Sequence, residues 1–183
     1  GNSPKIEFLI HGIEDENTIK RIESSIIDLI DKKNLTNKIG GYESSDFGRM
    51  DLNQIIGKYS SKKVDIVEKV LLIKLSKTFR YNMSEIELYD YTRGIWIISE
   101  DKRKEIDYVF CVYDGIIQET YKVLDWFPGG STYSVRHDKE EWKKHERWEF
   151  VGNISNVMRK KYRHKSVSHY FPSGSRNPVR YTF

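Results

Sequence analysis

Cysteine is nearly absent from this chain of 183 residues, because Cys111 is the single one. One cysteine excludes a disulfide within the chain, and free thiols persist in reducing compartments. We therefore expect a cytoplasmic protein. Cys111 lies within an apolar run, which favours a thiol buried in the core over a catalytic nucleophile.

Long apolar runs are missing as well. No segment approaches the roughly 18 consecutive apolar residues that a membrane-spanning helix requires, and residues 1–4 lack the apolar stretch of a signal peptide. With 38% hydrophobic and 32% charged residues, the composition is typical of a globular protein rather than a disordered one. We expect no membrane partner.

The motifs of several enzyme classes are absent too. The sequence contains no G-x-S-x-G, G-x-x-x-x-G-K-[ST] or G-x-G-x-x-G string, so no motif supports acyl transfer or nucleotide hydrolysis. The five histidines show no H-x-x-x-H spacing, and there is no C-x-x-C pair. The sequence therefore predicts neither a metal site nor a cofactor.

A metal-dependent nuclease remains the enzymatic alternative. Its candidate residues would be two aspartates, a glutamate and a lysine around one strand pair: Asp107, Asp114, Glu119 and Lys122. Such sites place Glu and Lys two residues apart on one face of a strand, whereas Lys122 follows Glu119 by three and should point to the opposite face. We assign no catalytic residue.

Acidic residues are lacking from the last part of the chain. Val151–Phe183 holds seven Lys and Arg with no Asp or Glu, which leaves 24 basic against 27 acidic residues in the preceding 150. A local excess of this kind suits a polyanion such as nucleic acid, although a solvated face is the alternative. The residues that we expect to contact phosphates are Arg159, Lys160, Lys161, Arg163 and Lys165.

The N-terminal part carries one strand pattern and one helix pattern. Alternating apolar residues predict a strand over Lys5–Ile13, and apolar residues spaced by three and four predict an amphipathic helix with Asn17 as its N-cap. Asn34–Ser61 is rich in Gly and Ser and should be mostly loop, with a short helix at Leu52–Ile56. We divide the chain into an N-terminal strand–helix extension with its loop, residues 1–61, and a domain of residues 62–183.

The second domain should begin with a strand over Lys69–Leu75 and a helix over Glu85–Arg93. Ser84 and Glu87 have capping-box spacing, and Gly94 stands where the helix should stop. Asp114-Gly115 between two β-rich runs predicts a hairpin over Tyr108–Val123 with a type I′ turn. Uninterrupted pairing from this turn would set Phe110 opposite Glu119 and Tyr108 opposite Tyr121.

Trp126–Ser134 should be a loop. The remaining elements should be a strand at Trp148–Val151, a helix at Asn156–Arg163 and a strand at Val179–Phe183.

Aromatic residues are numerous, with four Trp and twelve Tyr. Aromatic faces stack on bases, and Arg adds contacts to phosphates or base edges. For Trp96 and Trp148 a place in the core is the favoured alternative, since aromatic residues dominate core packing. The candidate base-binding residues are Tyr91, Arg93, Trp96 and Trp126.

Three segments carry a resemblance: E-L-Y-D-Y-T-R-G-I-W at Glu87–Trp96, Y-V-F-C-V-Y-D-G-I-I-Q-E-T-Y-K-V at Tyr108–Val123, and R-W-E-F-V-G at Arg147–Gly152. They resemble an uncharacterised bacterial domain found beside nuclease and defence modules, and the order of elements is similar to the PUA-like superfamily with its EVE, YTH and ASCH domains. This resemblance implies an α+β fold, a small mixed or antiparallel β-barrel flanked by helices.

The resemblance also implies a function. Such domains bind RNA or modified DNA bases in an aromatic pocket, which here would have Tyr91, Arg93 and Trp96 along one wall. The expected function is a nucleic-acid-binding module that recognises a modified or flipped base in a bacterial restriction or defence context. DNA is favoured over RNA, and a nuclease or motor subunit is a further expected partner. Besides the nuclease, a protein-interaction or regulatory domain without nucleic-acid affinity stays open.

Overall fold

The structure is a computed structural model that describes residues 10–30, 50, 52–81, 83–134, 146–172, 174 and 177–183. The chain divides into two compact units, Gly1–Met50 and Asp51–Phe183. None of the described helices is long and apolar enough to cross a membrane.

The described part of the first unit contains the helix α1 (Glu16–Leu29), which confirms the amphipathic helix. Its N-cap is Asp15 rather than Asn17, because the Asp15 carboxylate accepts the backbone N–H of Thr18 at 2.7 Å. Most of the predicted strand Lys5–Ile13 lies outside the described residues.

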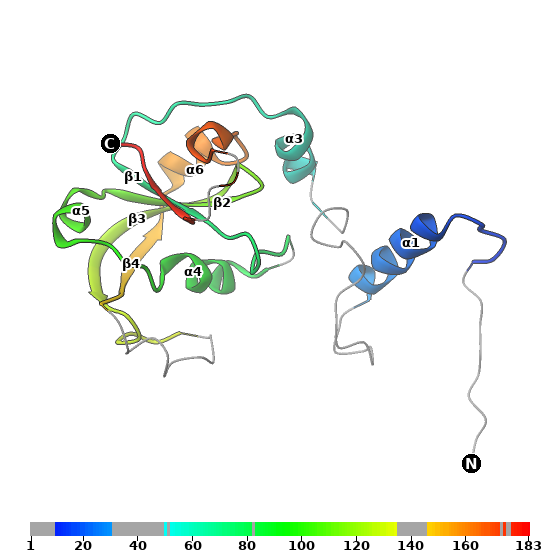
Figure 1. The fold of residues 1–183 in the computed structure, drawn as a ribbon, viewed down its shortest axis with the longest axis horizontal. Helices are drawn as coiled ribbons and strands as arrows, with labels where there is room; N and C mark the ends of the chain where they lie inside the picture. Colours follow the sequence, from blue (N-terminus) through cyan, green and yellow to red (C-terminus); the bar gives the residue numbers. More distant parts are fainter. Residues whose placement is uncertain are drawn as a thin grey trace, which may run out of the picture. The chain divides into compact units, whose positions relative to one another are not determined.

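The second unit is an α+β fold, as expected (Figure 1). Its five strands are β1 (Val70–Lys74), β2 (Tyr108–Tyr113), β3 (Ile116–Pro128), β4 (Trp148–Ile154) and β5 (Val179–Tyr181). They form one sheet in the order β4-β3-β2-β1-β5, in which β1 and β2 are parallel and the other neighbours antiparallel. These strands form an open sheet, so the closed barrel is not confirmed.

Helices cover both faces of this sheet. They are α3 (Leu52–Ser60), α4 (Glu85–Arg93), α5 (Glu100–Glu105) and α6 (Asn156–Tyr162), with a 3-10 turn at Ser168–Tyr170. One core packs α4, through Leu88, against Leu71, Ile73 and Val109, and the other packs α6, through Met158 and Tyr162, against Leu72 and Phe110. The central strands β1 and β2 are therefore apolar on both faces.

The helix α4 has the predicted bounds and the predicted capping box. The Ser84 hydroxyl accepts the N–H of Glu87, and the Glu87 carboxylate accepts the N–H of Ser84 at 3.0 Å. The helix α5 was not predicted from the sequence, and β3 continues through Trp126 to Pro128, where a loop was expected.

The hairpin of β2 and β3 has its turn where the sequence predicts it. Asp114 and Gly115 both have positive φ, 50° and 71°, as a type I′ turn requires. The predicted register holds only as far as Val112 opposite Ile117, since a bulge follows and sets Glu119 opposite Cys111. The bulge places Ile117 in the α6-side core and Tyr121 in the α4-side core.

The outer edge of β4 is covered by the segment of α4 and the loop after it. Trp96 and Trp148 exchange two backbone hydrogen bonds of 2.8 Å. Further along the edge, the Tyr89 hydroxyl accepts the N–H of Gly152 at 2.9 Å and donates to the carbonyl of Phe150 at 3.4 Å. These contacts satisfy backbone groups that would otherwise be open to strand pairing.

The helix α3 belongs to the second unit, although the boundary was expected after Ser61. Gly57 is buried, and a Cβ at this position would stand 3.2 Å from both the Cβ and the carbonyl oxygen of His164. A glycine thus lets α3 approach the chain next to α6.

Gly152 allows β4 to pass close to β3, so we expect Gly152→Ala to destabilise the second unit. An added Cβ would stand 2.3 Å from the carbonyl oxygen of Lys122, which is backbone and cannot move aside cheaply. Overpacking of this kind should lower the free energy of unfolding by about 2 kcal/mol or more. Urea unfolding monitored by Trp fluorescence measures the change. Asn153→Ala, on the exposed neighbouring residue, is the control, and equal stability of the two variants would contradict the prediction.

Candidate functional site

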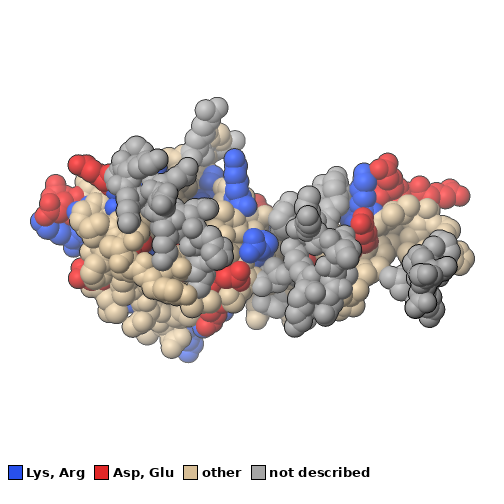
Figure 2. Space-filling view, turned by 90° about the horizontal axis from the view of Figure 1, so that it is seen from below, with Lys and Arg blue, Asp and Glu red and all other residues tan. Residues whose placement is uncertain are grey.

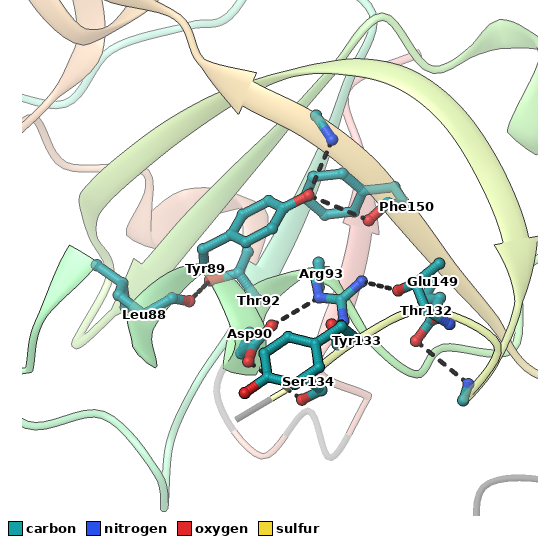
Figure 3. Close-up of polar contacts among 12 residues, drawn as sticks. Leu88, Tyr89, Asp90, Thr92, Arg93, Thr132, Tyr133, Ser134, Glu149 and Phe150 are labelled. Carbon is teal, nitrogen blue, oxygen red and sulfur yellow. Dashed lines mark hydrogen bonds and ion pairs between the residues drawn. The ribbon is translucent and has the colours of Figure 1, made fainter. Parts of the chain in front are cut away.

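Arg93, a candidate base-binding residue, is buried, and its polar contacts are drawn in Figure 3. Only 3% of its side chain is exposed, and its Nε donates to Asp90 Oδ1 at 2.7 Å. Its two terminal nitrogens donate to the Thr132 hydroxyl and the Tyr133 carbonyl. The guanidinium therefore ties α4 to the connection between β3 and β4.

A second buried acid holds the same connection. Glu149, at the start of β4, is 1% exposed and accepts the N–H of Thr132 at 2.8 Å and that of Gly130 at 3.2 Å. The Asp90 carboxylate accepts the hydroxyl of Ser134 at 3.1 Å (Figure 3). Charged acceptors make strong hydrogen bonds, so residues 129–134 are fixed in place rather than free to move.

The fixed connection forms one wall of a groove of about 760 Å³. The opposite wall is the segment from Ile97 through the first turns of α5. This volume lies within the range of about 300–1,000 Å³ that is usual for small-molecule sites. The residues that line it are Ile97, Ile98, Ser99, Glu100, Arg103, Pro128, Gly129, Gly130, Ser131, Glu146, Arg147 and Trp148.

One indole and two guanidinium groups are among the side chains that line the groove. The guanidinium carbon of Arg103 lies 3.4 Å from the ring centroid of Trp148, and Arg103 donates to the carbonyl of Ile98 at 2.5 Å. Arg147 donates to the carbonyl of Ile95 at 3.3 Å. Each guanidinium has five N–H donors, so donors remain for a ligand. Neither Arg103 nor Arg147 forms an ion pair with a carboxylate of the described ranges.

Two acidic residues, Glu100 and Glu146, line the groove as well. Glu100 pairs with Lys104 at 2.7 Å, and this hydrogen bond keeps the pKa of Glu100 below its usual value. Figure 2 shows basic and acidic side chains next to each other at the left end of the molecule, where α5 lies in Figure 1. The lining of the groove is therefore mixed in charge, with Glu100 and Glu146 beside Arg103 and Arg147.

None of the four candidate base-binding residues lines the groove. Trp96 is half-buried and donates its indole N–H to the carbonyl of Thr92 at 2.8 Å. Trp126 packs on Phe150 with 5.7 Å between ring centroids, and Tyr91 packs against the α4-side core. Trp148, which could have been core, is the tryptophan at the groove. Sequence reasoning missed Arg103 and Arg147, although Arg147 belongs to the R-W-E-F-V-G segment.

Three of the five candidate phosphate-binding residues are engaged within the protein. Arg159 donates to Glu119 at 2.9 and 2.5 Å and to Glu85 at 2.8 Å, and the bonds to Glu119 raise the pKa of Arg159. Lys161 pairs with Glu68 at 2.7 Å. Arg163 donates to the carbonyl of Gln118 at 2.9 Å.

Lys160 and Lys165 are exposed. Within the described ranges neither forms an ion pair. Of the five candidates, these two thus keep their charge available to an external anion.

Apart from Asp114, which is exposed in the hairpin turn, the groups weighed for catalysis are engaged or buried. Glu119 is 1% exposed and committed to Arg159, while Lys122 pairs with Asp107 at 3.3 Å. Burial raises the pKa of the Cys111 thiol to about 12, so it is not a thiolate nucleophile at neutral pH. In the part of the chain that the structure describes, no group of three His, Cys, Asp or Glu side chains could hold a metal ion.

Comparison with known proteins adds no relative. A scan against models of protein families found no match, and neither the curated proteins nor the solved structures contain a chain that matches this one.

We expect Glu149→Gln to loosen the groove wall. An amide oxygen can replace only one carboxylate acceptor, so one of the backbone N–H groups of Gly130 and Thr132 loses its partner, at a cost of about 1–3 kcal/mol. Amide hydrogen exchange measured by NMR should become at least about tenfold faster at Gly130 and Thr132.

Glu146→Gln is the control for this experiment, because it makes the same chemical change at an exposed residue near the groove. It should leave both exchange rates unchanged. Unaltered exchange in Glu149→Gln would show that the carboxylate does not hold the connection.

Proposed function

We propose that the second unit is a nucleic-acid-binding module that holds an exposed base in the groove beside Trp148. The observation that carries this proposal is the stack of Arg103 on Trp148 next to Arg147, inside a groove large enough for a nucleotide. Indole and guanidinium planes stack on bases, and guanidinium donors suit phosphates and base edges. The fixed wall supports it further, since a preformed groove loses little entropy on binding.

The ligand class follows from the same groups and from the PUA-like resemblance. The resemblance favours a modified or flipped base, in DNA rather than RNA, in a restriction or defence context. The closed barrel is also part of this proposal, and the length and bend of β3 support it (Figure 1). Lys160 and Lys165 would contact phosphates, whereas Arg159, Lys161 and Arg163 would stabilise the fold.

A second candidate function is binding of a protein partner, and one observation favours it. The helix α3 exposes four apolar residues at spacings of three and four: Leu52, Ile55, Ile56 and Tyr59. Such a stripe is typical of a helix face that packs against another surface.

Binding to labelled oligonucleotides tests the first function. The panel would contain duplex and single-stranded DNA and RNA, plain and base-methylated, at low and moderate salt with Mg²⁺ present. We expect salt-sensitive binding that prefers one base or modification, with the oligonucleotides left intact. Cleaved products would indicate a nuclease, and no binding at low salt would leave the protein-interaction function.

We expect Trp148→Ala to weaken this binding and to remove the base preference. Loss of base stacking costs about 1–3 kcal/mol, which is roughly 5- to 150-fold in affinity. Arg147→Gln should also weaken binding while keeping the indole. Trp126→Phe is the control, because Trp126 packs in the core, lies outside the groove and has an indole N–H without a partner among the described residues. Equal affinity of Trp148→Ala and Trp126→Phe would place the base elsewhere.

A further inference from the structure

Two segments far apart in the sequence pair near the start of β3. Lys63 forms a parallel bridge with Ser166, in which the N–H of Val64 donates to the carbonyl of Ser166 at 2.9 Å and the N–H of Ser166 donates to the carbonyl of Lys62 at 3.1 Å. Ser166 also bridges Ile116 on its other side. The pairing thus anchors residues 62–64 to the sheet through residues 164–167.

This parallel register brings lysines together. The bridge between Lys63 and Ser166 brings the backbone of Lys62 and Lys63 beside that of Lys165, which precedes Ser166, and neighbouring strands are about 4.8 Å apart. Lys62, Lys63 and Lys165 are all exposed. Like charges that lie close together repel each other, so this cluster of three lysines would be stabilised by an anion that lies near them.

The neighbouring carboxylates are occupied by other groups. Asp65 lies 3.0 Å from His169, and Glu68 accepts from Lys161 at 2.7 Å and from the Tyr162 hydroxyl at 2.5 Å. Burial tends to raise the pKa of Glu68, but these hydrogen bonds outweigh it and lower the pKa, so Glu68 stays ionised in its own pair. Within the described ranges, none of the three lysines forms an ion pair.

The backbone around the lysines is fixed at both ends. The N–H of His164 donates to the carbonyl of Ile117 at 2.8 Å, and the N–H of Ile117 donates to the carbonyl of Lys165 at 3.0 Å. His164 has a φ of 63°, in the left-handed region, which turns the chain out of α6 into this pairing. The lysines are therefore presented by an ordered frame rather than by a free tail.

We propose that Lys62, Lys63 and Lys165, here named the lysine strip, bind successive phosphates of a nucleic-acid strand. The inference rests on the proposed function and adds to it a second contact region, away from the groove. The strip is next to Ile116, where β3 begins, whereas Pro128, where β3 ends, lines the groove. Thirteen residues at about 3.3 Å each separate the two regions by at most about 40 Å along the strand. We favour a nucleic acid over other polyanions as the ligand because a nucleic-acid strand is long enough to contact both the strip and the groove.

Neutralising the strip in the full chain tests this proposal. The variant is Lys62→Gln with Lys63→Gln and Lys165→Gln. The matched control is Lys69→Gln with Lys104→Gln and Lys122→Gln, three lysines that each pair with a carboxylate. Both triple variants change the net charge by the same amount, so a general charge effect would weaken the nucleic-acid binding of both variants equally. The probes are a labelled 20-base-pair DNA duplex and a 20-nucleotide single strand.

We expect the strip variant to bind at least about tenfold more weakly than the control at about 0.1 M salt, for every sequence. The slope of log affinity against log salt should become shallower by about 0.9 per lysine on duplex and about 0.7 on single strands. Its midpoint of thermal unfolding should be equal to or above that of the native chain, because the repulsion among the three lysines is removed. Base preference, which the groove determines, should stay.

Three results would overturn the inference, each in a distinguishable way. If the native chain binds oligonucleotides and the strip variant binds them as tightly as the control does, the inference about the lysine strip is contradicted. The proposed function is not affected by that result. If the native chain binds no oligonucleotide at low salt, the result contradicts both the lysine-strip inference and the proposed function. If the native chain binds phosphatidylserine vesicles through the strip and no oligonucleotide, the lysines serve an anionic lipid surface instead.

Discussion

The geometry of the second unit depends on a buried carboxylate at the start of β4. Glu149 accepts backbone N–H groups of Gly130 and Thr132, and beside it Asp90 and Arg93 hold Thr132, Tyr133 and Ser134. Buried charges are costly unless they are fully hydrogen-bonded, and here they share a single network (Figure 3). The network holds residues 130–134 by hydrogen bonds, and Gly130 and Ser131 of this segment line the groove together with Trp148.

The β-bulge in β3 has a comparable effect on the charges. Because Gln118 is the extra residue, Glu119 pairs with Cys111, and its carboxylate meets Arg159 from α6. Arg159 and Arg163 are thereby drawn toward the sheet, where they satisfy a buried acid and a carbonyl. The basic excess of the C-terminal segment thus divides into cations that stabilise the fold and cations that remain at the surface. Counting charges along the sequence overstates the number available to a ligand.

The two proposed contact regions have different physical character. The groove offers planar, stackable groups in a fixed cavity, which suits discrimination among bases. The lysine strip offers point charges at the surface, which suit phosphates of any sequence and depend strongly on salt. Both belong to one rigid sheet, since β3 connects them. A module of this kind would gain affinity from one end of β3 and selectivity from the other.

The sequence by itself determined the local features, because these depend on neighbours in the chain. The capping box of Ser84 and Glu87, the Asp114-Gly115 turn, the helix α1 and the burial of Cys111 all followed from short patterns. The sequence did not determine the bulge after Ile117, since one unpaired residue leaves no signal in the composition. It also did not determine that β3 continues through Trp126. Only the tertiary structure decided that Arg93 is buried, that Arg103 lies over Trp148 in a groove shared with Arg147, and that Lys63 pairs with Ser166. These residues are far apart in the chain, and whether a charge or a ring faces a ligand is set by its partners in space.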